Sequence, residues 1–136
     1  MLKDLKQNLV AYITASNDFS NNYISTRYKW DNYQADEMYL QSSIINVTEI
    51  KDTTTLIKSF QVQFLLVAKY EQDYDAAIDS FNNIMEFNIA FDSLNTLMTN
   101  ILVNIVKDFD TPSPITDSTF YSHIFQYTFT IQKDRS

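Results

Sequence analysis

SFQVQFLLVAKYEQDYDAAIDSFNNIMEFN, residues 59 to 88, is the stretch in which the hydrophobic pattern changes from one period to another. From Phe60 to Ala68 every second residue is apolar, which is the alternation of a β-strand with one face turned to a core. In the second half of this run, Leu65 and Val67 make the other face apolar as well. We therefore expect a strand whose far end is covered on both faces.

The same stretch then becomes helical. From Tyr74 to Asn88 apolar residues recur at helical spacing, and polar residues occupy the opposite side. This pattern predicts an amphipathic helix, with Asp73 as its N-cap because a carboxylate accepts from the free amides of a first turn. Asn88 is expected to end the helix in the left-handed conformation, where other chains use glycine.

Weaker patterns flank this stretch on both sides. Residues 2 to 13 place apolar side chains at helical spacing and predict a short N-terminal helix. Residues 42 to 51 are rich in β-branched side chains and predict a strand, followed by a looser polar turn. Aromatic and polar residues alternate from 121 to 132, which predicts a final strand with His123 on its aromatic face.

Residues 92 to 108 fit two patterns. Their apolar spacing suits a helix, whereas the segment ILVNIV at 101 to 106 is typical of a strand. We expect a short helical turn at 93 to 98 and a strand at 101 to 108, because the final strand needs a neighbour. Pro112 and Pro114 then indicate a loop, since proline cannot donate to a strand ladder.

Together these elements predict an α+β fold: a mainly antiparallel sheet of about four strands flanked by two helices, in the order α-β-β-α-β-β. The length of 136 residues suits a single domain, 1–136. Within it we expect a long loop at 17–41, in which short strands can hide, a proline-containing loop at 107–119 and a frayed tail at 133–136.

The composition excludes most catalytic chemistry. The chain has no Gly, no Cys and one His, which removes glycine-rich phosphate loops, thiolate nucleophiles and multi-histidine metal centres. We interpret His123 as a packed side chain with one hydrogen bond, and the acids near residues 71–75 and 108–110 as solvated helix-start and loop groups. We expect no enzyme, no cofactor and no metal.

Charge is unevenly distributed along the chain. Residues 71–117 hold nine acids and one base, a net charge of −8, whereas the rest holds eight acids and nine bases. Such a field repels a nucleic-acid backbone, so the stretch is either a solvated acidic face, a DNA mimic, or a surface past which DNA slides.

The apolar runs of the chain are far shorter than the roughly 20 residues of a membrane span. They predict a soluble protein without membrane contact, and no secretion signal is expected.

An aromatic segment lies within the predicted loop at 17–41. Its side chains combine large rings with basic groups, and we single out Arg27, Tyr28, Trp30 and Tyr33. Residues of these types supply much of the binding energy at protein interfaces, and two bases are few for nucleic acid. The rings therefore either contact a protein partner or cap the core of their own sheet.

In its order of elements the chain resembles the tail-terminator and tail-completion proteins of long-tailed bacteriophages. The resemblance is carried by LKDLKQNLVAYI at residues 2–13, by the strand and helix within residues 59–88, and by TFYSHIFQYTFTIQ at residues 119–132. It implies a homohexameric ring at the head-proximal end of a tail tube, which ends tube growth and joins tail to head. The implied partners are other copies, the tail tube protein and a neck or connector protein. The implied location is the tail or neck of the virion, after synthesis in the host cytoplasm.

With this role, DNA would pass the ring without specific binding. We expect the acidic surface to line or border the channel through Asp75, Asp79 and Glu86. The aromatic segment and the later loop would make subunit or head-side contacts, the loop through Phe109, Pro112 and Pro114. Two other classes stay open: an acidic inhibitor or DNA mimic that binds stoichiometrically, and a ligand-binding module that uses the region of Trp30.

Overall fold

The computed structural model describes residues 1–15, 22–25, 38–51, 55–68, 70–112 and 121–133. Its elements are α1 (Leu2–Thr14), β1 (Asn22–Ser25), β2 (Met38–Lys51), β3 (Leu56–Ala68), α2 (Glu71–Ile84), α3 (Phe87–Leu97), β4 (Ile101–Pro112) and β5 (Tyr121–Gln132). The predicted α+β class is confirmed, and every predicted helix and strand is present. One short strand, β1, and one helix, α3, are added to the predicted order.

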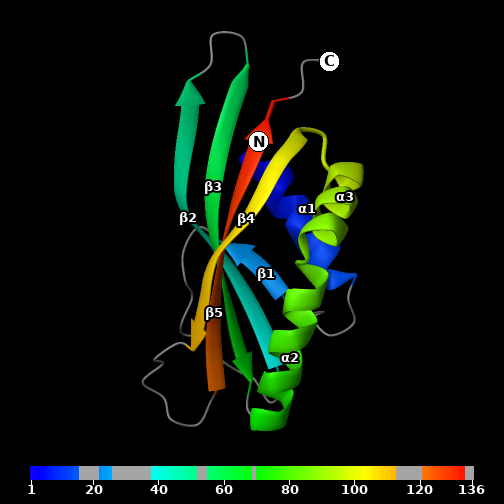
Figure 1. The fold of residues 1–136 in the computed structure, drawn as a ribbon, viewed down its shortest axis with the longest axis vertical. Coiled ribbons are helices and arrows are strands. Elements are labelled where there is room, and N and C mark those ends of the chain that lie inside the picture. The colour runs from blue at the N-terminus through cyan, green and yellow to red at the C-terminus, as the bar shows by residue number, and fades with distance from the viewer. Residues whose placement is uncertain (16–21, 26–37, 52–54, 69, 113–120, 134–136) are drawn as a thin grey trace.

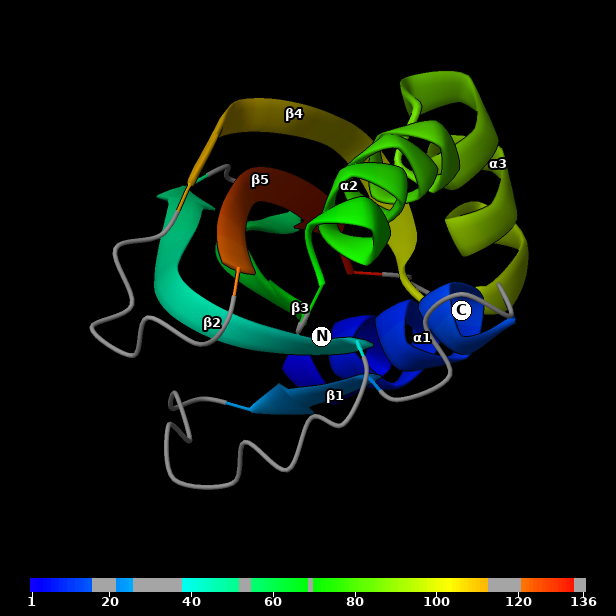
Figure 2. The ribbon, with the colours of Figure 1, turned by 90° about the horizontal axis from the view of Figure 1, so that it is seen from below.

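The strands form one sheet in the order β1-β2-β3-β5-β4. The four long strands are antiparallel to their neighbours, whereas β1 runs parallel to β2 and pairs with residues 40–43. The three helices lie together on one side of the curved sheet (Figures 1 and 2). We call this side the helix face and the other side the outer face.

The core lies between the sheet and the helices. Phe81 of α2 packs against the rings of Phe125 and Phe64, with centroid separations of 4.5 Å and 5.0 Å. Phe60, Val62, Phe64 and Leu66 alternate into this core, as the period of two predicts. Leu65 and Val67, on the other face of β3, are also fully buried, so the predicted double coverage of this strand end is confirmed.

The start and end of the predicted central helix differ from expectation. The N-cap residue of α2 is Tyr70, which makes no capping hydrogen bond with its side chain. Asp73 therefore lies inside the first turn, where its negative charge still interacts favourably with the helix dipole. The helix stops at Ile84, and Asn88 lies inside α3. Glu86 explains this break: its backbone is non-helical, and its Oε2 accepts from the amide of Ile89 at 3.1 Å, which starts a new helix.

The ambiguous segment is resolved into helix and strand. Helix α3 is longer than the predicted turn at 93 to 98, and the strand at 101 to 108 is confirmed. The strand continues to Pro112, so the predicted loop is wrong for residues 107–112. Strand β4 ends the sheet, and a strand at the edge tolerates a residue without an N–H. Residues 113–120 lie outside the described residues.

The predicted loop at 17–41 contains strand at two places. Residues 22–25 form β1, and β2 begins at Met38. The remaining residues of that loop, 17–21 and 26–37, lie outside the description. At the other end of the chain, the amide of Lys133 donates to the carbonyl of Leu56 at 2.9 Å, so this first residue of the predicted frayed tail is held by the sheet.

Candidate assembly surface

The exposed side of α2 carries the acidic surface. Asp75 and Asp79 lie one turn apart on α2, Glu86 caps the next helix, and all three side chains are exposed. None of them forms an ion pair with another described residue. Lys107, the single base in residues 71–112, instead pairs with Asp110 and donates to the side-chain oxygen of Asn82 at 3.0 Å. The negative potential of α2 is therefore not neutralised locally. That these acids face a channel stays a prediction.

Of the predicted contact residues, the structure describes Phe109 and Pro112. Both lie on the exposed part of β4, and Phe109 has 44% of its surface accessible. Arg27, Tyr28, Trp30, Tyr33 and Pro114 lie outside the described residues, so the proposed role of the aromatic segment stays a prediction.

Phe109 belongs to a longer apolar row on the same strand. Ile101, Val106 and Phe109 stand opposite Gln132, Thr128 and Gln126 of β5 on the outer face, and Val103 occupies a register shift between them. Each of the four apolar side chains is 44–46% exposed. Contiguous exposed apolar side chains mark surfaces that contact another molecule. The sequence did contain a signal for this row, in ILV at residues 101–103. Adjacent apolar residues in a strand make both of its faces apolar, which is unusual for a strand at the edge of a sheet.

The backbone of this edge strand is partly closed to strand addition. The side-chain amide of Asn95 donates to the carbonyl of Leu102 at 3.1 Å and accepts from its N–H at 2.8 Å. Asn104 accepts from the amide of Ile105 at 3.0 Å, and Pro112 has no N–H. Unpaired edges invite pairing with other chains, and these groups reduce that tendency. Contacts along β4 must therefore use side chains more than backbone.

His123 sits at the centre of a hydrogen-bonded chain that joins three elements. It is packed as predicted, with 5% of its surface exposed, but it makes two hydrogen bonds instead of one. Its Nδ1 lies 3.0 Å from the hydroxyl of Tyr74 on α2, and its Nε2 lies 2.9 Å from Oδ1 of Asp110 on β4. Asp110 also pairs with Lys107. Asp110 is therefore a strand residue with two side-chain partners, which corrects the predicted loop, although it is exposed as expected.

The surroundings of this hydrogen-bonded group of side chains favour a structural role. Burial raises the pKa of the Tyr74 hydroxyl, and the charges of Asp75 and Asp110 raise it further, so the phenol stays protonated at neutral pH. Hydrogen bonds from Lys107 and then His123 lower the pKa of Asp110. A protonated phenol is a poor nucleophile. We interpret the group as a latch between α2 and the end of the β4–β5 pair.

Asp108, the other acid assigned to the loop, organises the outer face. Its Oδ2 accepts from Gln126 at 3.1 Å and from Thr128 at 2.8 Å, and Gln126 in turn accepts from Gln63 at 2.9 Å. These bonds cross β4, β5 and β3. The outer face therefore combines an ordered polar strip with the apolar row beside it.

The described part of the chain lacks two other kinds of site. No group of three or more His, Asp or Glu side chains is arranged to hold a metal ion there. None of the described helices has both the length and the apolar character needed to span a bilayer.

The sequence matches no known family model and no curated protein. Its fold, however, is similar to that of a chain in the virion of a native gene transfer agent particle, with a TM-score of 0.57 at 8% identity. The alignment covers 93% of this chain and 90% of the other. At this identity the likeness concerns the fold, and it extends over nearly the whole of both chains.

Proposed function

We propose that this chain is a structural virion protein that forms a ring at the head-proximal end of a tail tube, ends tube growth and joins tail to head. The observation that carries the proposal is the likeness in fold, over 93% of the chain, to a chain of a gene transfer agent virion. The order of elements that resembles tail-terminator proteins points in the same direction.

The surface of the chain supports a role in assembly. The exposed row of Ile101, Val103, Val106 and Phe109 offers apolar area to a neighbour. A ring needs a heterologous contact, in which two different surfaces of one chain meet and the rotation closes. The proposed partners are further copies in a hexamer, the tail tube protein and a neck or connector protein. The proposed location is the virion, after synthesis in the host cytoplasm.

The acidic surface supports passage of DNA without specific binding. Asp75, Asp79 and Glu86 are exposed and have no cationic partner among the described side chains. In a ring Asp75 and Asp79 would line the channel, where their charge repels the phosphate backbone, and Glu86 would border it. In this role the protein works by shape and charge and is not an enzyme.

The experiment combines purified protein with particles. Mass measurement at several concentrations, followed by electron microscopy with and without tail tubes, should show rings of constant size. Particles made without the protein should contain tubes of uneven length and heads without tails. Normal joined particles in its absence would refute the proposed function.

One observation favours a second candidate, an acidic inhibitor or DNA mimic. Helix α2 presents Glu71, Asp73, Asp75 and Asp79 without a single basic residue. A mimic would bind a DNA-binding enzyme stoichiometrically and be displaced by DNA. The ligand-binding alternative depends on Trp30, which lies outside the described residues.

A further inference from the structure

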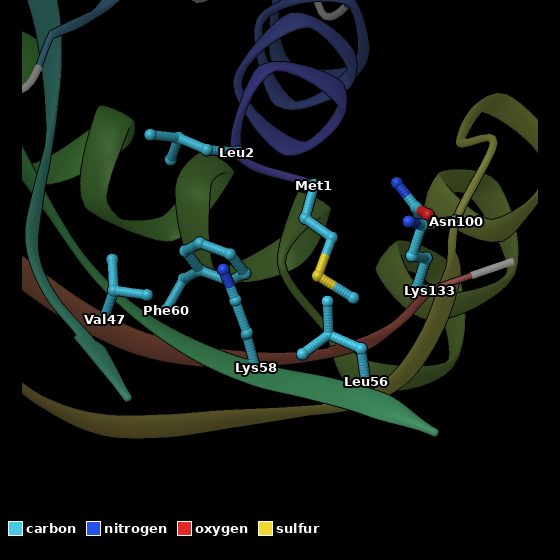
Figure 3. Close-up of a pocket in the computed structure, with 8 residues that line it drawn as sticks. All are labelled: Met1, Leu2, Val47, Leu56, Lys58, Phe60, Asn100 and Lys133. Carbon is cyan, nitrogen blue, oxygen red and sulfur yellow. The ribbon is translucent and has the colours of Figure 1, made fainter. Parts of the chain in front are cut away.

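A groove opens at the end of the sheet where α1 begins. It has a volume of about 280 Å³ and is lined by Met1, Leu2, Val47, Leu56, Lys58, Phe60, Asn100 and Lys133. The side chain of Met1, just before α1, and those of Leu56, Lys58 and Phe60 on β3 converge on it (Figure 3). We call this site the basic groove, because its apolar floor lies beside two lysines.

The charges around the basic groove leave both lysines available. Lys58 and Lys133 form no ion pair with any described residue, although Glu49 stands opposite Lys58 in the β2–β3 register. The carboxylate of Asp4 lies next to Asn100. It accepts from the backbone amide of Asn100 at 2.9 Å and from the side-chain amide of Asn100 at 3.0 Å. The groove therefore favours a ligand that brings its own negative charge.

The size of the groove favours a protein side chain. Pockets that hold drug-sized ligands measure roughly 300–1,000 Å³, and this groove lies just below that range. A single aromatic side chain beside a carboxylate would match both the apolar floor and the lysines. Aromatic anchors that enter such pockets contribute much of the energy of protein interfaces.

The chain itself carries a segment of this kind, at the start of α3. Glu86 is exposed, Phe87 is 44% exposed and Ile89 is 54% exposed. The carboxylate of Glu86 accepts from the amide of Ile89 through Oε2 and from the side chain of Asn88 through Oε1, at 3.4 Å. Each oxygen has a second lone pair, so the carboxylate keeps acceptor capacity for an amine. No residue of α2 or α3 lines the basic groove, so the segment does not occupy the groove of its own chain.

We propose that the basic groove receives Glu86 and Phe87 from a second copy of this chain. Phe87 would cover the floor formed by Leu56 and Phe60, while Glu86 would face the two lysines. The acidic part of the chain, with a net charge of −8 from nine acids and one base, would thus meet its nearly neutral part. The inference rests on the proposed ring and names the two surfaces that would meet in it.

The absence of cysteine from the chain allows a direct test. Lys58→Cys and Phe87→Cys proteins are purified separately, mixed and oxidised, so that only a contact between copies gives a disulfide-linked dimer. We expect this dimer to form well above the level given by Lys58→Cys mixed with Leu97→Cys. Leu97 is a matched control because it is 47% exposed at the other end of α3.

A second measurement uses charge. Lys58→Glu combined with Lys133→Glu should weaken self-association on the order of tenfold or more, whereas Lys3→Glu, at an exposed position of α1, should not. Rings that form without the specific disulfide would overturn this inference and leave the proposed function standing. The disulfide without rings would support the groove contact and count against the ring. Monomers that give neither would overturn the inference.

Discussion

Nε2 of His123 lies 2.9 Å from Oδ1 of Asp110, which connects the start of β5 to the end of the edge strand β4. The other ring nitrogen reaches Tyr74 on α2, so one buried imidazole holds three elements together. These two hydrogen bonds fix the end of β4, next to Phe109, against β5 and α2, and so hold Phe109 in a defined orientation toward a neighbour.

We expect His123→Ala to destabilise the fold by about 1–3 kcal/mol, because it leaves the hydroxyl of Tyr74 and the carboxylate of Asp110 without this partner. The measurement is urea unfolding at neutral pH. Thr111→Ala, at an exposed position of the same strand pair, serves as the control and should change stability little. Equal stability of the two variants would show that the latch contributes nothing.

The stability contributed by Asp110 should depend on pH. Hydrogen bonds from Lys107 and His123 lower the pKa of Asp110 in the folded state, so its contribution is complete above the unfolded value, about 3.9. It is lost as the pH falls through the lowered folded pKa. Stability curves of the wild type and Asp110→Asn should therefore converge below about pH 4. Asp92→Asn, at an exposed site on α3, controls for the loss of one surface charge. A constant difference between the wild type and Asp110→Asn over this range would contradict the assignment.

Asn95→Ala should open the edge of β4. The change removes both hydrogen bonds to Leu102 and leaves its N–H and carbonyl free to pair with another strand. We expect increased aggregation on storage, measured by light scattering and by a dye that binds cross-β structure. Asn83→Ala, at an exposed position of α2, is the matched control. If both variants aggregate alike, Asn95 does not protect the edge.

Reversing the charge of Asp75 and Asp79 should impair DNA passage while rings still assemble. Glu86 is left unchanged in this variant because it caps α3 and belongs to the proposed subunit contact. The measurements are particle infectivity or gene-transfer activity, together with ring formation by the purified protein. Unaltered activity of particles that contain Asp75→Lys and Asp79→Lys would rule out the channel role of these two acids.

Local periodicity was sufficient to predict β3, β5 and α2, because burial on one face imposes a period of two on a strand and of about 3.6 on a helix. The same reasoning placed His123 in the core and located the acidic surface. It failed at Asn88, because Glu86 captures the amide of Ile89 and starts a new helix. It failed at Asp73, because α2 begins after Tyr70 without any side-chain cap.

The candidate site was only partly predictable. Phe109 and Pro112 were singled out, but as loop residues. The two prolines suggested a loop, whereas an edge strand tolerates a proline within it. The basic groove could not be predicted, since Lys58 and Lys133 lie far apart in the sequence and meet only where β3 begins and β5 ends.

The amino-acid sequence alone determined the class of fold, the alternation of the central strands and the separation of an acidic part from a nearly neutral part, since these properties depend on residues close together in the chain. Tertiary structure decided which strand lies at the edge, which groups seal it, and which side chains surround His123 and the groove. Those features depend on strand pairing between distant segments, whose order is set by the burial of the whole core and leaves no local pattern.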